Sequence, residues 1–153
     1  MVTDSKHKDA LLTLQKAGIS KTSQRLAVLD ILLKATTPLS VNTIRQSLET
    51  KARIDKVTVY RILTLFRQRG IIREIASAGG ANYFEMATLE NPLHPHFSCR
   101  NCGAFTCLAP LPFTQAPELM LSKDDYSIDR IEINISGLCA CCRNATNPQK
   151  SMI

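Results

Sequence analysis

The sequence contains no tryptophan, and aromatic residues make up only 5% of its 153 residues. A large substrate pocket lined by aromatic rings is therefore not expected. No apolar run approaches the roughly 20 residues that a membrane-spanning helix needs, and the first residues lack the apolar core of a secretory signal. We therefore expect no membrane partner and a cytoplasmic protein, in which cysteines more often serve metal or redox chemistry than disulfides.

Charged residues and cysteines, by contrast, are plentiful and are unevenly distributed along the chain. Residues 1–80 carry 14 Lys/Arg and 6 Asp/Glu, a net charge of +8, whereas residues 81–153 carry 5 and 7, a net of −2. All six cysteines lie in the second part. The charge division suggests that the first part contacts a polyanion, although a solvated basic surface would give the same pattern.

Apolar spacing predicts four helices and then a hairpin in the first part. The fourth helix, near residues 56–69, places its apolar side chains at i, i+3, i+4 and i+7. These side chains are Val59, Ile62, Leu63 and Phe66. The runs IIREIA and ANYFEM then have strand character and are joined by a Gly-Gly turn. Four helices followed by a hairpin are typical of a winged helix-turn-helix.

The face of the fourth helix opposite the core carries Thr58, Tyr60 and Arg61. Arginine can bond both acceptors on a guanine edge, while threonine and tyrosine can reach phosphates or a thymine methyl group. Lys21 and Arg25, at the start of the second helix, could fix the register through phosphates. The pattern predicts a helix for the major groove of DNA, and the alternative is a solvated helix in a protein–protein module.

Two Cys-x-x-Cys pairs, Cys99/Cys102 and Cys139/Cys142, are the strongest motif in the sequence. Each turn lets two thiolates converge on one ion, and two such turns complete a tetrahedral zinc site. Two disulfides or a dithiol redox pair are the alternatives. A short helix at residues 114–122 and a strand at 128–135 are predicted between the pairs. Cys141 is interpreted as a bystander thiol.

Four other residues give only weak metal signals when each is taken alone. His94 and His96 alternate on a predicted strand, so their imidazoles point to one side. Cys107 lies in the next short strand, where a single cysteine is more often a small buried side chain. Glu85 ends the predicted wing and is unremarkable by itself.

Several segments in order resemble the ferric uptake regulator superfamily of bacterial metal-responsive repressors. They are AGISKTSQRLAVLDIL, VTVYRIL, GIIRE…GGANYFE, HPHFSCRNCG and GLCACC, and the likeness covers roughly residues 10–143. The resemblance implies an α+β protein with a winged-helix DNA-binding domain at 1–86 and a hinge at 87–93. An α/β dimerisation and metal-binding domain with a structural four-cysteine zinc site would follow at 94–153. It also implies a homodimer on double-stranded, palindromic operator DNA, contacted by Tyr60 and Arg61.

The resemblance joins Glu85, His94, His96 and Cys107 into one regulatory metal site at the hinge. A first-domain histidine that often joins this site in iron and peroxide sensors has no counterpart in TTPLSV. A thiolate with imidazoles favours Zn²⁺ over the all-N/O sets expected for Fe²⁺ or Mn²⁺, and the zinc-uptake regulators of the family resemble this mixture.

We therefore predict a zinc-responsive transcriptional repressor with a structural zinc and a second, regulatory divalent metal, and no enzymatic activity. One alternative is an iron-, manganese- or peroxide-responsive regulator of the same family. The other is a non-sensing zinc-ribbon adaptor or nucleic-acid-processing accessory protein, which would hold one zinc per chain.

Overall fold

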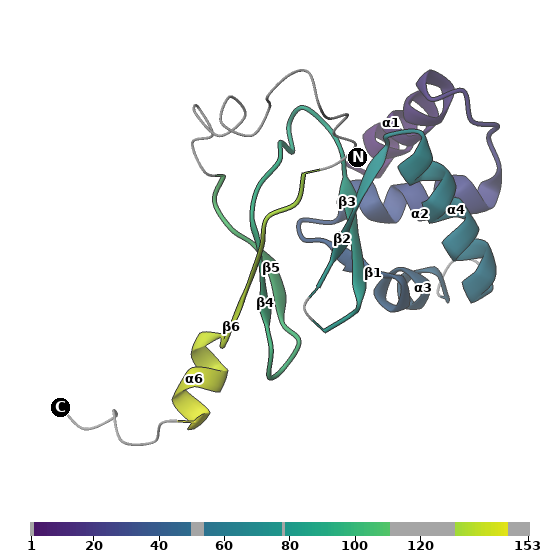
Figure 1. The fold of residues 1–153 in the computed structure, drawn as a ribbon. Coiled ribbons are helices and arrows are strands. Elements are labelled where there is room, and N and C mark those ends of the chain that lie inside the picture. Colours follow the sequence, from purple (N-terminus) through teal and green to yellow (C-terminus); the bar gives the residue numbers. More distant parts are fainter. Residues whose placement is uncertain (1, 50–53, 78, 111–130, 147–153) are drawn as a thin grey trace, which may run out of the picture. The chain divides into compact units, whose positions relative to one another are not determined.

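The computed structural model describes residues 2–49, 54–77, 79–110 and 131–146, and the chain divides into two compact units, Met1–Pro92 and Leu93–Ile153 (Figure 1). The first unit contains α1 (Val2–Lys16), α2 (Ser23–Lys34), β1 (Leu39–Ser40), α3 (Val41–Glu49), α4 (Lys56–Gln68), β2 (Ile72–Ala76) and β3 (Asn82–Met86). The second contains β4 (His96–Cys99), β5 (Phe105–Cys107), β6 (Asn134–Gly137) and α6 (Ala140–Thr146).

Helices α2 and α3 of the first unit begin where the sequence supplies caps. The Thr22 hydroxyl accepts a hydrogen bond from the Arg25 amide at the start of α2, at 3.3 Å. The Ser40 hydroxyl accepts from the Thr43 amide at 3.1 Å at the start of α3. Each cap satisfies a backbone N–H that has no partner within its helix. Threonine and serine are both residues that favour this capping position.

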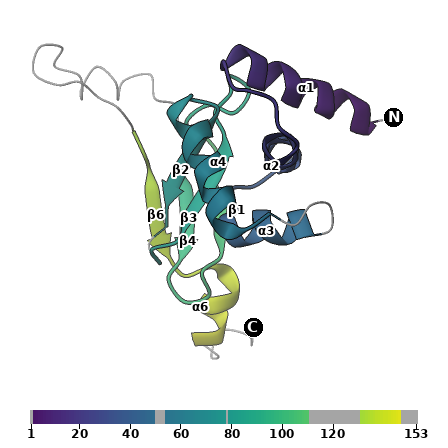
Figure 2. The same cartoon turned by 90° about the vertical axis from the view of Figure 1, so that its right-hand side faces the viewer.

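The hydrophobic core of the described residues lies in the first unit, where α1 to α4 pack together and against the small sheet (Figure 2). Helix α4 contributes the four apolar side chains predicted from its spacing, all of them buried: Val59, Ile62, Leu63 and Phe66. The opposite face of α4 is thereby left to polar and basic side chains.

The wing is an antiparallel sheet with strand order β1-β3-β2. Its hairpin places Arg73 directly opposite Glu85. Gly80 has a φ of +77° in the turn, a backbone conformation that side chains with a Cβ rarely adopt. The helices and this wing confirm the winged-helix prediction for the first unit.

The second unit is built on a sheet of order β5-β4-β6, in which β4 pairs antiparallel with β5 and parallel with β6. Its described residues bury no leucine, isoleucine, valine or phenylalanine. The buried side chains there are His94, Pro95, His96, Ser98, Cys99 and Cys142. The two units together give the predicted α+β class.

Some predicted elements differ from the structure. The strand expected at residues 128–135 is β6 at Asn134–Gly137, since pairing of Cys99 with Gly137 sets its register. Helix α6, which continues past Cys142 to Thr146, was not predicted. Residues 128–130 and the helix expected at 114–122 lie outside the described residues. The two-residue strand β1 was not predicted.

Candidate metal centres and nucleic-acid interface

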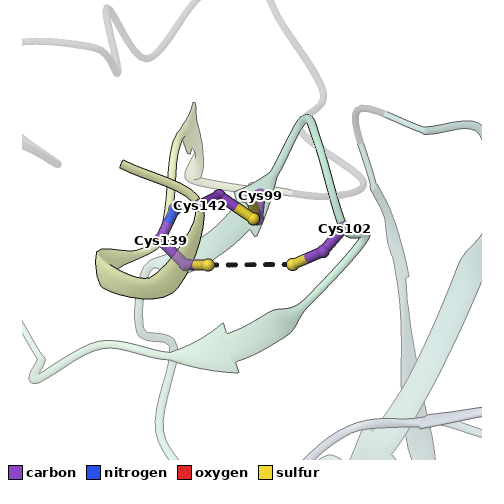
Figure 3. A group of neighbouring side chains, drawn as sticks. All are labelled: Cys99, Cys102, Cys139 and Cys142. Carbon is purple, nitrogen blue, oxygen red and sulfur yellow. Dashed lines mark hydrogen bonds between the residues drawn. The ribbon is translucent and has the colours of Figure 1, made fainter. Parts of the chain in front are cut away.

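The two Cys-x-x-Cys pairs form one cluster in the second unit (Figure 3). Cys99 ends β4 and Cys102 lies in the turn that follows, while Cys139 precedes α6 and Cys142 lies in its first turn. The four sulfur atoms all lie within 4.8 Å of one another. The Sγ atoms of Cys102 and Cys139 are 3.7 Å apart. The structure thus brings together the four cysteines that the motif singles out.

Local backbone geometry explains why these sulfurs converge. Gly103 has a φ of +73°, and its amide donates to the Cys99 carbonyl at 2.9 Å, which closes the first turn. A Cβ built on Gly137 would lie 3.2 Å from the Phe97 ring, so a glycine lets β6 approach β4 closely. The Cys139 amide then donates to the Cys99 sulfur at 3.3 Å.

The electrostatics of the cluster fit a bound cation. Backbone amides of Cys102 and Cys139 lower the pKa of Cys99 to about 6. The Asn101 amide also lowers the pKa of Cys142, but the neighbouring thiols of Cys139 and Cys102 outweigh it and raise that pKa to about 12. Four thiolates this close repel one another unless a cation is present, and four sulfurs suit tetrahedral Zn²⁺.

A second cluster stands at the start of the second unit and contains His94, His96 and Cys107. Their ligand atoms lie within 4.8 Å of one another. Cys107 is the cross-strand neighbour of His96, and the two imidazole rings are 4.5 Å apart. Both histidines are buried and Cys107 is half-buried. The ring of His96 also stacks on Phe105, with centroids 5.4 Å apart, which fixes its orientation.

Glu85, the fourth residue of the predicted regulatory site, lies on β3 in the first unit. Its side chain is only 7% exposed and pairs with Arg73 on β2, with an N–O distance of 2.8 Å. A buried carboxylate needs such a partner because burial removes its hydration. The sequence interpretation missed Arg73, although the register of a short hairpin could have pointed to it.

The predicted DNA-binding residues gather at the N-terminal ends of α2 and α4. Tyr60, Arg61 and Lys21 are exposed, while Arg25 and Thr58 are half-buried. A groove between the two helices is lined by Thr22, Gln24, Arg25, Thr58, Arg61, Ile62 and Leu65. The Arg25 guanidinium donates to the Ser20 carbonyl at 2.8 Å, so it is already ordered. The arrangement offers several hydrogen-bond donors on one face.

Asp55 is a residue of this face that the sequence interpretation missed. It caps α4, accepting from the Thr58 amide at 2.9 Å and from the Thr58 hydroxyl. These hydrogen bonds to Thr58 lower the pKa of Asp55. An aspartate three residues ahead of a threonine, just before an apolar-periodic run, was the available signal.

A hollow beside the wing extends the same face. Residues from β1, α3, α4 and the β2–β3 hairpin line it: Ser40, Val41, Asn42, Lys56, Tyr60, Gly80, Ala81 and Asn82. The Lys56 ammonium lies 5.8 Å from the centre of the Tyr60 ring, a cation–π distance. Residues of the wing thus line this hollow together with residues of α3 and α4, and sequence alone identified only the helical part.

The fold and the two clusters define a class of protein: a winged-helix DNA-binding regulator coupled to a metal-binding β unit. The model of the ferric uptake regulator family matches residues 16–136, and the chain belongs to this family. Proteins of the family are metal-binding transcriptional regulators rather than enzymes, and they bind operator DNA as dimers. The family prediction is therefore confirmed, and so is the absence of an enzymatic role.

Individual relatives come from several branches of the family. The peroxide operon regulator of Bacillus subtilis (strain 168) is 27% identical over 141 residues, which are 92% of this chain and 95% of that protein. The crystal structure of the Vibrio cholerae ferric uptake regulator is 26% identical with a TM-score of 0.66, covering 82% of this chain and 96% of that one.

A zinc uptake regulator solved with zinc and DNA is 20% identical with a TM-score of 0.65, covering 95% of this chain and 98% of that one. At this identity, the likeness supports the fold alone. Peroxide-responsive repressors recur among the similar proteins, for example in Staphylococcus epidermidis at 25% identity over 94% of this chain and 95% of that protein. The comparisons thus do not single out the zinc-uptake branch.

Among the described helices, none is both long enough and apolar enough to cross a membrane.

Proposed function

We propose that this protein is a cytoplasmic, metal-responsive transcriptional repressor that binds palindromic operator DNA as a homodimer. The observation that carries the proposal is the cluster of His94, His96 and Cys107, which begins two residues after the DNA-binding unit ends at Pro92. A metal held there would lie just beyond the end of the first unit along the chain. In a dimer, the orientation of the two α4 helices decides whether they match the half-site spacing.

Glu85 is proposed as the fourth ligand because of the resemblance to the family. It belongs to the first unit, whereas the other three ligands belong to the second. Coordination by all four would tie the units together and select the orientation that suits DNA. Without metal, only a fraction of the chains has that orientation, and the apparent affinity for DNA falls by that fraction.

The donor set favours zinc as the regulatory metal. Two imidazoles, one thiolate and one carboxylate form a four-ligand set, and thiolate with imidazole suits tetrahedral Zn²⁺. Fe²⁺ and Mn²⁺ are better matched by nitrogen and oxygen ligands alone. The four-cysteine cluster is the proposed site of a separate, structural zinc.

A peroxide-responsive regulator is the second candidate, favoured by the similarity to peroxide regulators in Bacillus and Staphylococcus. In that case, the same cluster would hold a redox-active metal, and peroxide would release the operator. In this chain the candidate ligands would be the same residues in both cases, since the first-domain histidine that often joins the site in peroxide sensors has no counterpart in TTPLSV.

The test is fluorescence anisotropy of a labelled palindromic operator, using protein that keeps its structural zinc. Zn²⁺ is expected to raise operator affinity by about 5- to 150-fold, the usual range of allosteric coupling. Equal affinity with and without any of Zn²⁺, Fe²⁺ or Mn²⁺ would contradict a metal switch. Release of the operator by hydrogen peroxide from the Fe²⁺-loaded protein, with no response to Zn²⁺, would select the second candidate.

Metal counting separates both candidates from a non-sensing zinc-ribbon protein. Elemental analysis of the dimer is expected to give two metal ions per chain under saturating conditions. One zinc per chain, with no change of DNA affinity on adding metal, would support the non-sensing alternative.

The proposed DNA contacts give a separate prediction. Arg61 is exposed on α4, where its guanidinium can bond a guanine edge. Arg61→Ala is expected to weaken operator binding by about 1–3 kcal/mol and to relax sequence preference at one base pair. Arg100→Ala, in an exposed turn of the second unit, is the matched control because it removes the same charge. Equal losses in the two variants would mean that only net charge matters.

Thr58 and Tyr60 are proposed to assist Arg61, and Lys21 and Arg25 to contact phosphates. Phosphate contacts weaken with salt because binding releases counterions. Operator affinity should therefore depend less steeply on salt when Lys21 is replaced.

A further inference from the structure

Arg73 makes two sets of contacts that meet at the proposed ligand Glu85. The two residues face each other across the β2–β3 hairpin. The Arg73 Nε donates to Glu85 Oε1 at 3.0 Å, and its Nη2 lies 2.8 Å from the same oxygen. Both donors therefore hold one oxygen of the carboxylate. Charge-assisted hydrogen bonds of this kind fix geometry better than a flexible ammonium could.

The same guanidinium also holds the end of the first unit. Nη2 donates to the Asn91 carbonyl at 2.7 Å and lies 3.4 Å from the Pro92 carbonyl. The Asn91 side chain donates to the Met86 carbonyl at 2.8 Å, so the loop after β3 folds back on the strand that bears Glu85. Arg73 thus links the proposed ligand to the last residues before the second unit begins.

Burial indicates that this contact is more than a surface ion pair. The side chains of Arg73 and Glu85 are 26% and 7% exposed, whereas exposed pairs contribute little to stability. The Arg67–Glu74 pair in the same unit provides a comparison, because its arginine is 44% exposed and its N–O distance is 2.6 Å. That pair joins α4 to β2 and involves none of the proposed ligands.

We propose that Arg73 is a positioning residue of the regulatory metal site. It holds Glu85 by Oε1 and binds the segment up to Pro92, so the carboxylate is oriented before the metal arrives. Outer-shell partners that orient a ligand commonly contribute 10- to 100-fold to metal affinity. The inference rests on the proposed function, because it requires Glu85 to be a ligand.

The experiment is a double-mutant cycle on the full-length dimer with its structural zinc in place. Arg73→Gln, Glu85→Gln and the double variant are titrated with Zn²⁺ against a chromogenic chelator, and with Co²⁺ monitored by visible absorption. Arg73→Gln is expected to weaken regulatory binding about 10- to 100-fold. In the Glu85→Gln background, the same change should have little further effect, because Arg73 acts through that carboxylate.

Several readouts distinguish positioning from a general structural role. Arg67→Gln is the matched control and should leave both titrations unchanged. The Co²⁺ spectrum of Arg73→Gln should move toward that of Glu85→Gln, a shift that loss of stability alone would not produce. If Arg73→Gln does not fold, Arg73→Lys replaces it. Lysine keeps the positive charge but lacks the several donor nitrogens of the guanidinium, so an intermediate metal affinity is expected.

The outcomes also separate the two proposals. If Glu85→Gln leaves regulatory binding unchanged, Glu85 is not a ligand and the proposed site itself fails. If Glu85→Gln weakens binding while Arg73→Gln or Arg73→Lys binds as tightly as the natural protein, the site stands and the positioning role is overturned. The positioning role would also be overturned if Arg73→Gln lowered metal affinity by the same factor in the natural protein and in the Glu85→Gln variant.

Discussion

Replacing Cys102 by serine is expected to remove one zinc per chain and to unfold the second unit. The described part of that unit buries two cysteines and two histidines but no leucine, isoleucine, valine or phenylalanine. In this described part, a bound zinc would supply cross-links where apolar packing is sparse, as in small domains that fold only when zinc is bound. Elemental analysis and far-UV circular dichroism, with and without a chelator, measure the two effects.

Cys141→Ser is the matched control for this variant. Cys141 is exposed and lies outside the four-cysteine cluster, although it precedes Cys142 in the chain. This control should keep its zinc, its spectrum and its oligomeric state. A Cys102→Ser protein that retains full zinc occupancy would contradict the assignment, and loss of that zinc on adding Cys141→Ser would show that Cys141 had replaced the missing ligand.

Replacing Cys107 by serine is expected to abolish the response to Zn²⁺ while the structural zinc stays bound. Cys107 supplies the only sulfur of its cluster, next to His96 across the β4–β5 pair. Loss of a direct ligand should weaken metal binding by more than the 10- to 100-fold typical of losing an outer-shell partner. Operator anisotropy in a Zn²⁺ titration and the zinc content after dialysis are the two measurements.

The Cys107→Asp variant tests whether the thiolate at this position determines which metal the site prefers. An oxygen in place of sulfur gives an all-N/O ligand set, which favours Fe²⁺ and Mn²⁺ relative to Zn²⁺. The metal preference for operator binding should therefore shift toward those ions. If Cys107→Ser retains the full zinc response, Cys107 is simply a half-buried side chain of β5, and the preference for zinc loses its main support.

The structure of the first unit could be predicted largely because its signals are local. The caps at Thr22 and Ser40 and the apolar stripe of α4 each depend on residues a few positions apart. The limits of β6 depend instead on pairing with β4, which is 38 positions away in the Asn134–His96 pair. Three of its four residues are exposed, so no inside–outside alternation marks the strand.

The candidate sites also differ in whether local or long-range signals predict them. Cys-x-x-Cys spacing was enough to predict the four-cysteine cluster, because the motif itself brings each pair of sulfurs together. Only the resemblance to a family identified His94, His96 and Cys107 as parts of one candidate metal site. Arg73 was missed because its importance lies in a cross-strand contact and in a carbonyl 18 residues further along the chain.

The position of the cysteines along the chain has a consequence for synthesis. The core of the first unit is complete within Met1–Pro92, but the last zinc ligand is Cys142, 50 residues beyond Pro92. At about 5–20 residues per second, the ribosome needs roughly 3–10 seconds to add those residues. Over the last 40 of those residues, from Cys102 to Cys142, Cys99 and Cys102 are an incomplete thiol pair on a nascent chain whose first unit has already been synthesised.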